Sequence, residues 1–190
     1  MEMLKQRIRE EGMVLPGDII KVDGFLNHQI DVGLLDAIGE QFAEIFADSG
    51  ATRVLTVEAS GIAIGYAVAH AMQLPLLFAK KGMAKNIGAN FYSADVYSYT
   101  RGSTYGIYVS QKYLHEEDRV LIVDDFLANG QACLGLVQLC RKAGADVAGI
   151  GIAIEKQWQR GSELLRNEGL PLHSLAVIKR IENGQVIFAD

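Results

Sequence analysis

The chain has 190 residues, of which 49% are hydrophobic and 22% are charged, and its formal net charge is −5. This length suits one substantial core and is short for two independent domains, so we expect residues 1–190 to form a single domain. No apolar run approaches membrane-spanning length, and the first residues lack the layout of a signal peptide, so the cytoplasm is the expected location. The acidic balance disfavours a nucleic-acid-binding surface.

The predicted elements begin with two helices. Residues 1–11 suit a short helix that ends at Gly12, and Asp31 is placed to cap a second helix with its apolar residues on one face. Further along, the pattern predicts strands at 53–59, 76–79, 120–123 and 147–154, and helices at 62–72 and 131–143. This alternation predicts an α/β fold with a mostly parallel sheet that helices cover on both faces.

Two stretches depart from the strand-helix alternation. Segments 93–100 and 105–110 alternate polar and apolar residues and follow a glycine-rich stretch at 82–91, so they predict an antiparallel pair. The chain closes with a strand at 174–180, a turn at 183–184 and a strand at 186–188.

The segment Val120–Ala132 is the most informative part of the chain. Four apolar residues lead into Asp124 and Asp125, and a short turn then opens the helix that Gly144 is expected to end. The two acids therefore lie at the carboxyl end of a buried strand, where open α/β sheets bind their ligands. Helix N–H groups favour phosphate, whereas carboxylates favour hydroxyls or a hard metal ion. The pattern predicts a ligand with a phosphate and a sugar diol, although a buried strand with two capping acids is the alternative.

This segment resembles the 5-phosphoribosyl 1-diphosphate (PRPP) signature of the type I phosphoribosyltransferases. The resemblance implies a mostly parallel central sheet flanked by helices, with a small hood formed from about residues 1–50 and other segments. It also implies that Asp124 and Asp125 are the catalytic acids, which engage the ribose hydroxyls. The loop that wraps the 5′-phosphate would consist of Ala128, Asn129, Gly130, Gln131 and Ala132. Amide side chains replace the hydroxyls common in this loop, so more of the binding should fall to backbone N–H groups.

Three further segments match this family. Residues 58–61 correspond to the loop that holds the diphosphate of PRPP, with Ser60 and Gly61 as contacts. Lys80 and Lys81, directly after the strand at 76–79, correspond to the basic pair, and Lys81 is assigned to PRPP. The stretch 82–91 corresponds to a mobile loop that closes over the site and excludes water. Seen alone, residues 58–61 could be an ordinary turn, and adjacent lysines are commonly just solvated.

The base-reading segments, residues 25–29 and 155–158, are similar to those of bacterial purine-salvage phosphoribosyltransferases that act on xanthine. This resemblance extends over nearly the whole chain. It implies that Ile20 and Asn27 contact the purine from the hood and that Lys156 contacts it from the sheet. A lysine supplies only donors, which suits a 6-oxo group and penalises adenine. Trp158 could stack on the purine, although a lone tryptophan is as readily a core residue.

The reaction that the resemblance implies converts xanthine and PRPP to xanthosine 5′-monophosphate and diphosphate. Mg²⁺ is expected to arrive bound mainly through the diphosphate, and no protein metal site is proposed. Ala128 stands where relatives acting on hypoxanthine and guanine carry an acid, so we assign no protein general base. The family also implies a homodimer. The alternatives are an enzyme that prefers guanine or hypoxanthine, and a non-catalytic PRPP-sensing regulator that binds nucleic acid.

Overall fold

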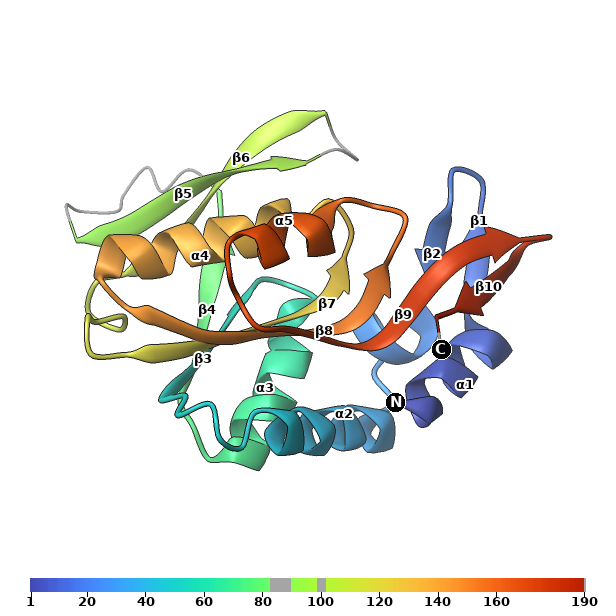
Figure 1. The fold of residues 1–190 in the computed structure, drawn as a ribbon, viewed down its shortest axis with the longest axis horizontal. Coiled ribbons are helices and arrows are strands. Elements are labelled where there is room, and N and C mark those ends of the chain that lie inside the picture. The colour runs from blue at the N-terminus through green and yellow to red at the C-terminus, as the bar shows by residue number, and fades with distance from the viewer. Residues whose placement is uncertain (83–89, 99–101, 190) are drawn as a thin grey trace.

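The computed structural model describes residues 1–82, 90–98 and 102–189 of the chain (Figure 1). Among these residues, eight strands form one sheet with the order β10-β9-β8-β7-β3-β4-β6-β5. Strands β9, β8, β7, β3 and β4 run parallel at the centre, and antiparallel pairs flank them on both sides. The bounds are β3 (Arg53–Val57), β4 (Leu76–Lys81), β5 (Phe91–Ser98), β6 (Ser103–Ser110), β7 (Arg119–Leu127), β8 (Asp146–Lys156), β9 (Leu172–Glu182) and β10 (Gln185–Phe188).

Helices cover both faces of this sheet, as the alternation of elements predicts. Helices α4 (Gln131–Ala143) and α5 (Gly161–Asn167) lie on one face, and α1 (Glu2–Glu11), α2 (Val32–Ile45) and α3 (Gly61–Met72) lie on the other (Figure 1). Each face has its own cluster of buried apolar side chains. The central strands are therefore buried on both sides, which explains why β7 and β8 are almost continuously apolar.

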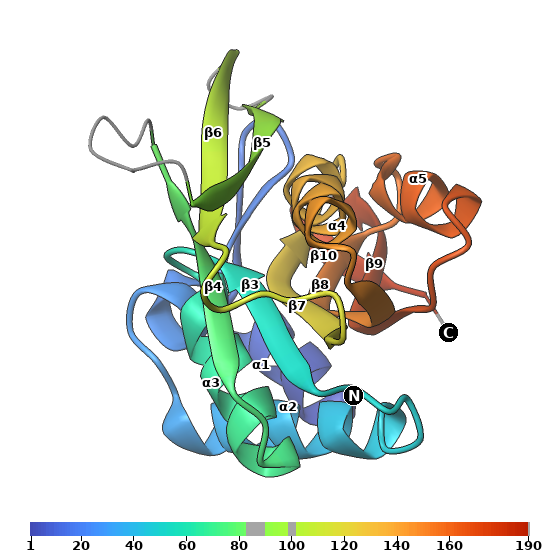
Figure 2. The same ribbon diagram turned by 90° about the vertical axis from the view of Figure 1, so that its left-hand side faces the viewer.

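Several predicted element ends are confirmed. The Asp31 side chain accepts a hydrogen bond from the N–H of Leu34 at 3.0 Å, so it caps α2. Gly144 ends α4 in the left-handed conformation, with φ of 76°. The predicted antiparallel pair is the β5–β6 hairpin, which projects from the layered body beside β4 (Figure 2). The predicted turn at 183–184 joins β9 to β10.

The sequence patterns do not predict the shortest helices and strands. Strands β1 (Met13–Leu15) and β2 (Ile19–Lys21) form a separate antiparallel hairpin, and a π-helix, η1 (Asp23–Asn27), follows it. Helix α5, of seven residues, was also not predicted. Three-residue strands and a single π turn are too short to show a hydrophobic period. The β1–β2 hairpin and the π-helix lie within the N-terminal region of about 50 residues that the resemblance assigns to the hood, and from here on the hood means residues 13–27 alone. No helix in the described ranges is both long and apolar enough to cross a membrane.

Candidate functional site

The acidic pair lies near the carboxyl end of β7, as predicted, and both side chains are buried, with 5% of Asp124 and 7% of Asp125 exposed. Both oxygens of the Asp125 carboxylate are engaged. Oδ1 accepts a hydrogen bond from the Ser60 hydroxyl and Oδ2 accepts one from the Asn27 side-chain amide, each at 3.0 Å. Asp125 therefore joins the start of α3 to the hood, which are far apart in the sequence.

Asp124 sits in an unfavourable place for a charge. Burial raises its pKa well above the ordinary value, and the neighbouring charge of Asp125 raises it further. The positive charge of Lys81 acts in the opposite sense, which places Lys81 within electrostatic reach of the pair. A Cβ on Gly61 would lie 3.0 Å from Oδ1 of Asp124 and 2.1 Å from Oγ1 of Thr56. Glycine is therefore what allows α3 to begin so close to the acids.

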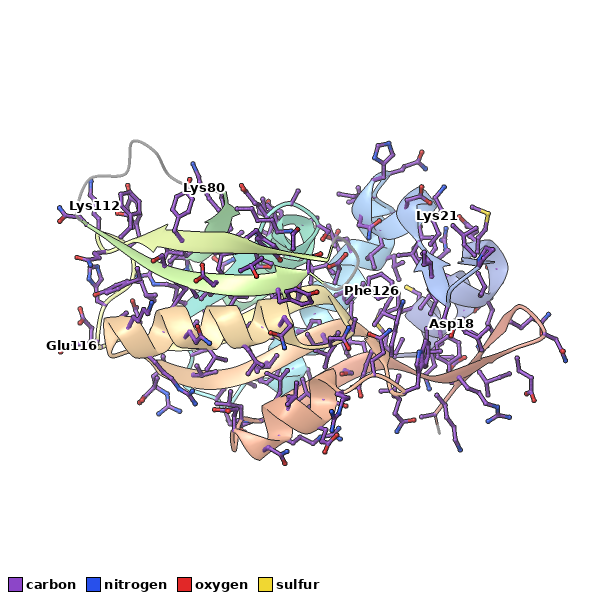
Figure 3. All side chains as sticks on the ribbon, turned by 90° about the horizontal axis from the view of Figure 1, so that it is seen from above. Asp18, Lys21, Lys80, Lys112, Glu116 and Phe126 are labelled. Atoms are coloured by element: carbon purple, nitrogen blue, oxygen red, sulfur yellow. The ribbon has the colours of Figure 1, made fainter. Side chains whose placement is uncertain are left out.

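The predicted diphosphate loop and the predicted basic pair meet here only in part. The carboxylate of Glu58, in the β3–α3 turn, accepts a hydrogen bond from the backbone N–H of Lys81 at 2.6 Å. The ammonium of Lys81 lies 5.6 Å from the ring centre of Tyr105. Lys80 instead lines a separate cavity of about 700 Å³ that runs along β4, with Arg53. Figure 3 shows Lys80 well away from Phe126, which adjoins the acidic pair.

The prediction that both lysines follow the strand is wrong, because they are the last two residues of β4. Antiparallel pairing with β6 extends the strand, since Lys81 lies opposite Ile107. Successive side chains of a strand point to opposite faces, which separates Lys80 from the site. The predicted mobile loop falls mainly on residues 83–89, outside the described residues.

The predicted phosphate loop forms one wall of a cavity of about 230 Å³. All five residues assigned to it line this cavity, and the β5–β6 hairpin supplies the opposite wall. The lining residues are Val96, Tyr97, Ser98, Tyr105, Phe126, Leu127, Ala128, Asn129, Gly130, Gln131, Ala132 and Cys133. Gly130 precedes α4 with a left-handed φ of 76°, so the free N–H groups of the helix start lie at the cavity. Such a helix start favours an anion.

Lys156, the last residue of β8, meets the hood at a defined point. Its ammonium donates a hydrogen bond to the backbone carbonyl of Asp18 at 3.0 Å. It also lies 5.9 Å and 6.0 Å from the ring centres of Phe126 and Trp158. Burial lowers the pKa of Lys156, and the Asp18 carboxylate partly offsets this. Figure 3 shows Phe126, near the end of β7, on the side of the sheet that faces the part of the hood with Asp18 and Lys21.

The other three residues predicted to contact the base, Asn27, Ile20 and Trp158, differ in exposure and in which atoms they can present to a ligand. Asn27 reaches the acidic pair through its bond to Asp125. Ile20 is buried, with 6% exposed, and packs in the apolar cluster that α1 and the hood share. Its backbone groups are therefore what it can offer a ligand. Trp158 is 37% exposed beside Lys156.

Three residues that shape the site were given no role of their own from the sequence, although Glu58 and Phe126 lie within segments that were assigned to it. Phe126 follows the acidic pair directly, and its place in the signature was an available signal. Asp18 acts through its main-chain carbonyl, and Glu58 through a contact with the main chain of Lys81. Contacts that involve a backbone atom leave no pattern in residue types, so no local signal marks them.

Comparisons with known proteins identify the fold and the family. An adenine phosphoribosyltransferase from Rhodothermus marinus superposes with a TM-score of 0.75 at 25% identity, over 93% of this chain and 97% of that one. The fold is that of the type I phosphoribosyltransferases. Xanthine phosphoribosyltransferases from Ruminiclostridium cellulolyticum and Listeria innocua are each 48% identical over 190 residues, which is all of this chain and 100% and 99% of theirs. The chain belongs to the xanthine phosphoribosyltransferase family. No family model matches it.

Proposed function

We propose that this protein transfers the 5-phosphoribosyl group of PRPP to xanthine, releasing diphosphate and forming xanthosine 5′-monophosphate. The observation that carries the proposal is the placement of the acidic pair. Asp125 is bonded on one side to the start of α3 and on the other to Asn27 of the hood, with the phosphate loop following in the chain. The names of the full-length relatives support xanthine as the base.

In this proposal each group on PRPP has a chemically suitable partner. Asp124 and Asp125 accept hydrogen bonds from the ribose hydroxyls, and the N–H groups of residues 128–132 receive the 5′-phosphate. Ser60, Gly61 and Lys81 bind the diphosphate, whose charge grows as its bond to the sugar breaks. Such a site would act by holding the reactants in line and stabilising charge.

The base would lie between the hood and Lys156. The lysine ammonium suits an oxygen acceptor on the purine, and Asn27 can both donate and accept. Ile20 would contribute backbone groups, and Trp158 an aromatic face. Ala128 stands where some relatives carry an acid and cannot accept a proton. Xanthine would instead lose a proton to solvent before it reacts, and the ionised purine would attack through a ring nitrogen without a protein base. A pH–rate profile that tracks a protein group instead of the substrate would contradict this.

We propose that Mg²⁺ enters with PRPP. The donor set fits, because diphosphate oxygens, water and nearby carboxylates are the hard ligands that Mg²⁺ prefers. Asp124 and Asp125 are the carboxylates that could reach such an ion or its waters. When bound, the ion would neutralise charge on the leaving diphosphate.

We also propose that residues 1–190 work as one domain in the cytoplasm, as a homodimer. The two cysteines, Cys133 and Cys140, are buried free thiols, which suits a reducing compartment. Light scattering on the purified protein, with and without PRPP, measures the oligomeric state.

The decisive experiment is a product assay in which PRPP is offered with xanthine, guanine, hypoxanthine and adenine in parallel. We expect xanthine to give the highest kcat/KM and adenine the lowest. An enzyme that uses guanine or hypoxanthine better than xanthine would establish the nearest alternative. PRPP binding without turnover of any purine would instead support the regulator.

A further inference from the structure

The start of α5 touches the phosphate loop at a pair of glycines, Gly161 of the helix and Gly130 of the loop. Gly161, the first residue of α5, donates its N–H to the carbonyl of Ala128 at 3.0 Å. A Cβ on Gly161 would lie 2.4 Å from that carbonyl oxygen and 2.9 Å from the nitrogen of Gly130. A Cβ on Gly130 would in turn lie 2.9 Å from the Cα of Gly161. The two backbones meet at a distance that leaves no room for a side chain on either residue.

Backbone conformation does not explain the glycine at position 161. Gly130 has a left-handed φ of 76°, which glycine adopts most easily, but Gly161 lies outside that region. An alanine at 161 could therefore take the same backbone angles. What excludes it is contact with the backbone of the phosphate loop, which cannot swing aside as a flexible side chain can.

The contact also orients the loop. Ala128 and Gly130 line the phosphate cavity, whereas Gly161 is not among the lining residues and lies behind them. The hydrogen bond to Gly161 therefore turns the Ala128 carbonyl toward the outer side of the loop. A carbonyl that faced the cavity would repel an anion, whereas N–H groups attract one.

We propose that Gly161 is a positioning residue, which sets the phosphate loop in the shape that grips the 5′-phosphate of PRPP. The inference rests on the proposed function, because it assumes that PRPP occupies this loop. The role is specific to one end of the ligand. The diphosphate is assigned to Ser60, Gly61 and Lys81, which belong to other segments, so Gly161 should not affect it.

The test compares G161A with a control, G169A, by calorimetry on the full-length protein with Mg²⁺. In G161A the loop backbone must shift by more than half an ångström to reach 3.0 Å from the new Cβ. We expect the Kd for PRPP to rise roughly tenfold or more, because small misplacements of binding groups are costly. The Kd for inorganic diphosphate should not change. Gly169 lies just after α5 with a φ of 74°, and a Cβ added there would meet no other atom. G169A therefore strains the backbone at the other end of α5 without touching the phosphate loop.

Three results of these binding measurements would contradict the proposed role of Gly161. Wild-type affinity for PRPP in G161A, or equal losses for PRPP and diphosphate, would overturn the role of Gly161. A G169A variant that loses PRPP as G161A does would also overturn it. A wild-type protein that binds no PRPP would overturn the proposed function itself, and the inference with it.

Hydrogen exchange on the wild-type protein tests the same idea should G161A fail to fold. PRPP should slow exchange at residues 160–165 together with residues 127–132, whereas diphosphate alone should slow neither. Unchanged exchange at 160–165 while the loop becomes protected would contradict the proposal.

Discussion

The end of the sheet and the hood build their parts of the site in different ways. At the end of the sheet, residues 120–132 supply the buried strand, both acids and the phosphate loop in one continuous run. The hood meets this structure through contacts between distant segments, such as Asn27 with Asp125 and the Asp18 carbonyl with Lys156. The proposed sugar-phosphate site is thus encoded by one contiguous stretch of sequence, whereas the proposed base site forms only when distant segments meet in the folded chain.

This difference implies a division of energetic roles. The phosphate loop is fixed by backbone contacts, which suits the 5′-phosphate of PRPP, a group that all phosphoribosyltransferases must bind whatever their base. The hood packs into the core through its apolar side chains and meets the end of the sheet through single polar contacts, so the residues that face the base can vary without disturbing phosphate binding. Asp125 is where the two parts join, because its two oxygens serve one part each.

The largest effect is therefore expected from Asp125→Ala. The change removes the proposed ligand of the ribose hydroxyls and leaves the donors on Ser60 and Asn27 without their acceptor. Hydrogen bonds to a charged group contribute about 1.5–3 kcal/mol each, so we expect kcat/KM for PRPP to fall on the order of a hundredfold or more.

The matched control is Asp146→Asn, at an exposed position where β8 begins. Steady-state kinetics of both variants make the comparison. An Asp125→Ala variant that impairs only purine binding would show that the acid belongs to the hood part alone.

A smaller and more selective effect is expected from Lys156→Ala. Loss of the ammonium should raise KM for the purine about tenfold, as for one charged hydrogen bond, and leave the Kd for PRPP nearly unchanged. Lys179→Ala, on an exposed part of β9, controls for the loss of a positive charge. Equal losses for both ligands would mean that the two parts of the site are not separable at this residue.

The same contrast explains how far the sequence predicts the molecule. The parallel sheet, the α4 start and the acidic pair follow from apolar runs, capping residues and one contiguous motif. The hood hairpin does not, because its strands have three residues each and owe their place to packing. Ile20 shows the limit at the site: family resemblance assigns it to the purine, but no local pattern reveals that its side chain is buried in the core.

The smallest expected effect is on the free energy of unfolding, and it concerns the buried carboxyl of Asp124 at the end of the sheet. Burial and the charge of Asp125 raise the pKa of Asp124, so the folded protein binds this proton more tightly than the unfolded chain does. The wild-type free energy of unfolding should therefore lose this contribution as pH rises from the ordinary carboxyl pKa through the raised one. Asp124→Asn does not titrate, and its amide oxygen can still accept the N–H of Asp125.

We accordingly expect Asp124→Asn to gain stability relative to the wild type as pH rises through that window, by on the order of 1 kcal/mol, while it loses PRPP binding. Urea unfolding of both proteins across acidic and neutral pH measures the difference, with Asp146→Asn as the exposed control. A difference that stays constant with pH would show that the end of the sheet carries no electrostatic cost. A gain in the predicted direction would show that the charge proposed to bind PRPP lowers the stability of the folded protein. The end of the sheet would then differ from the hood in carrying this electrostatic cost.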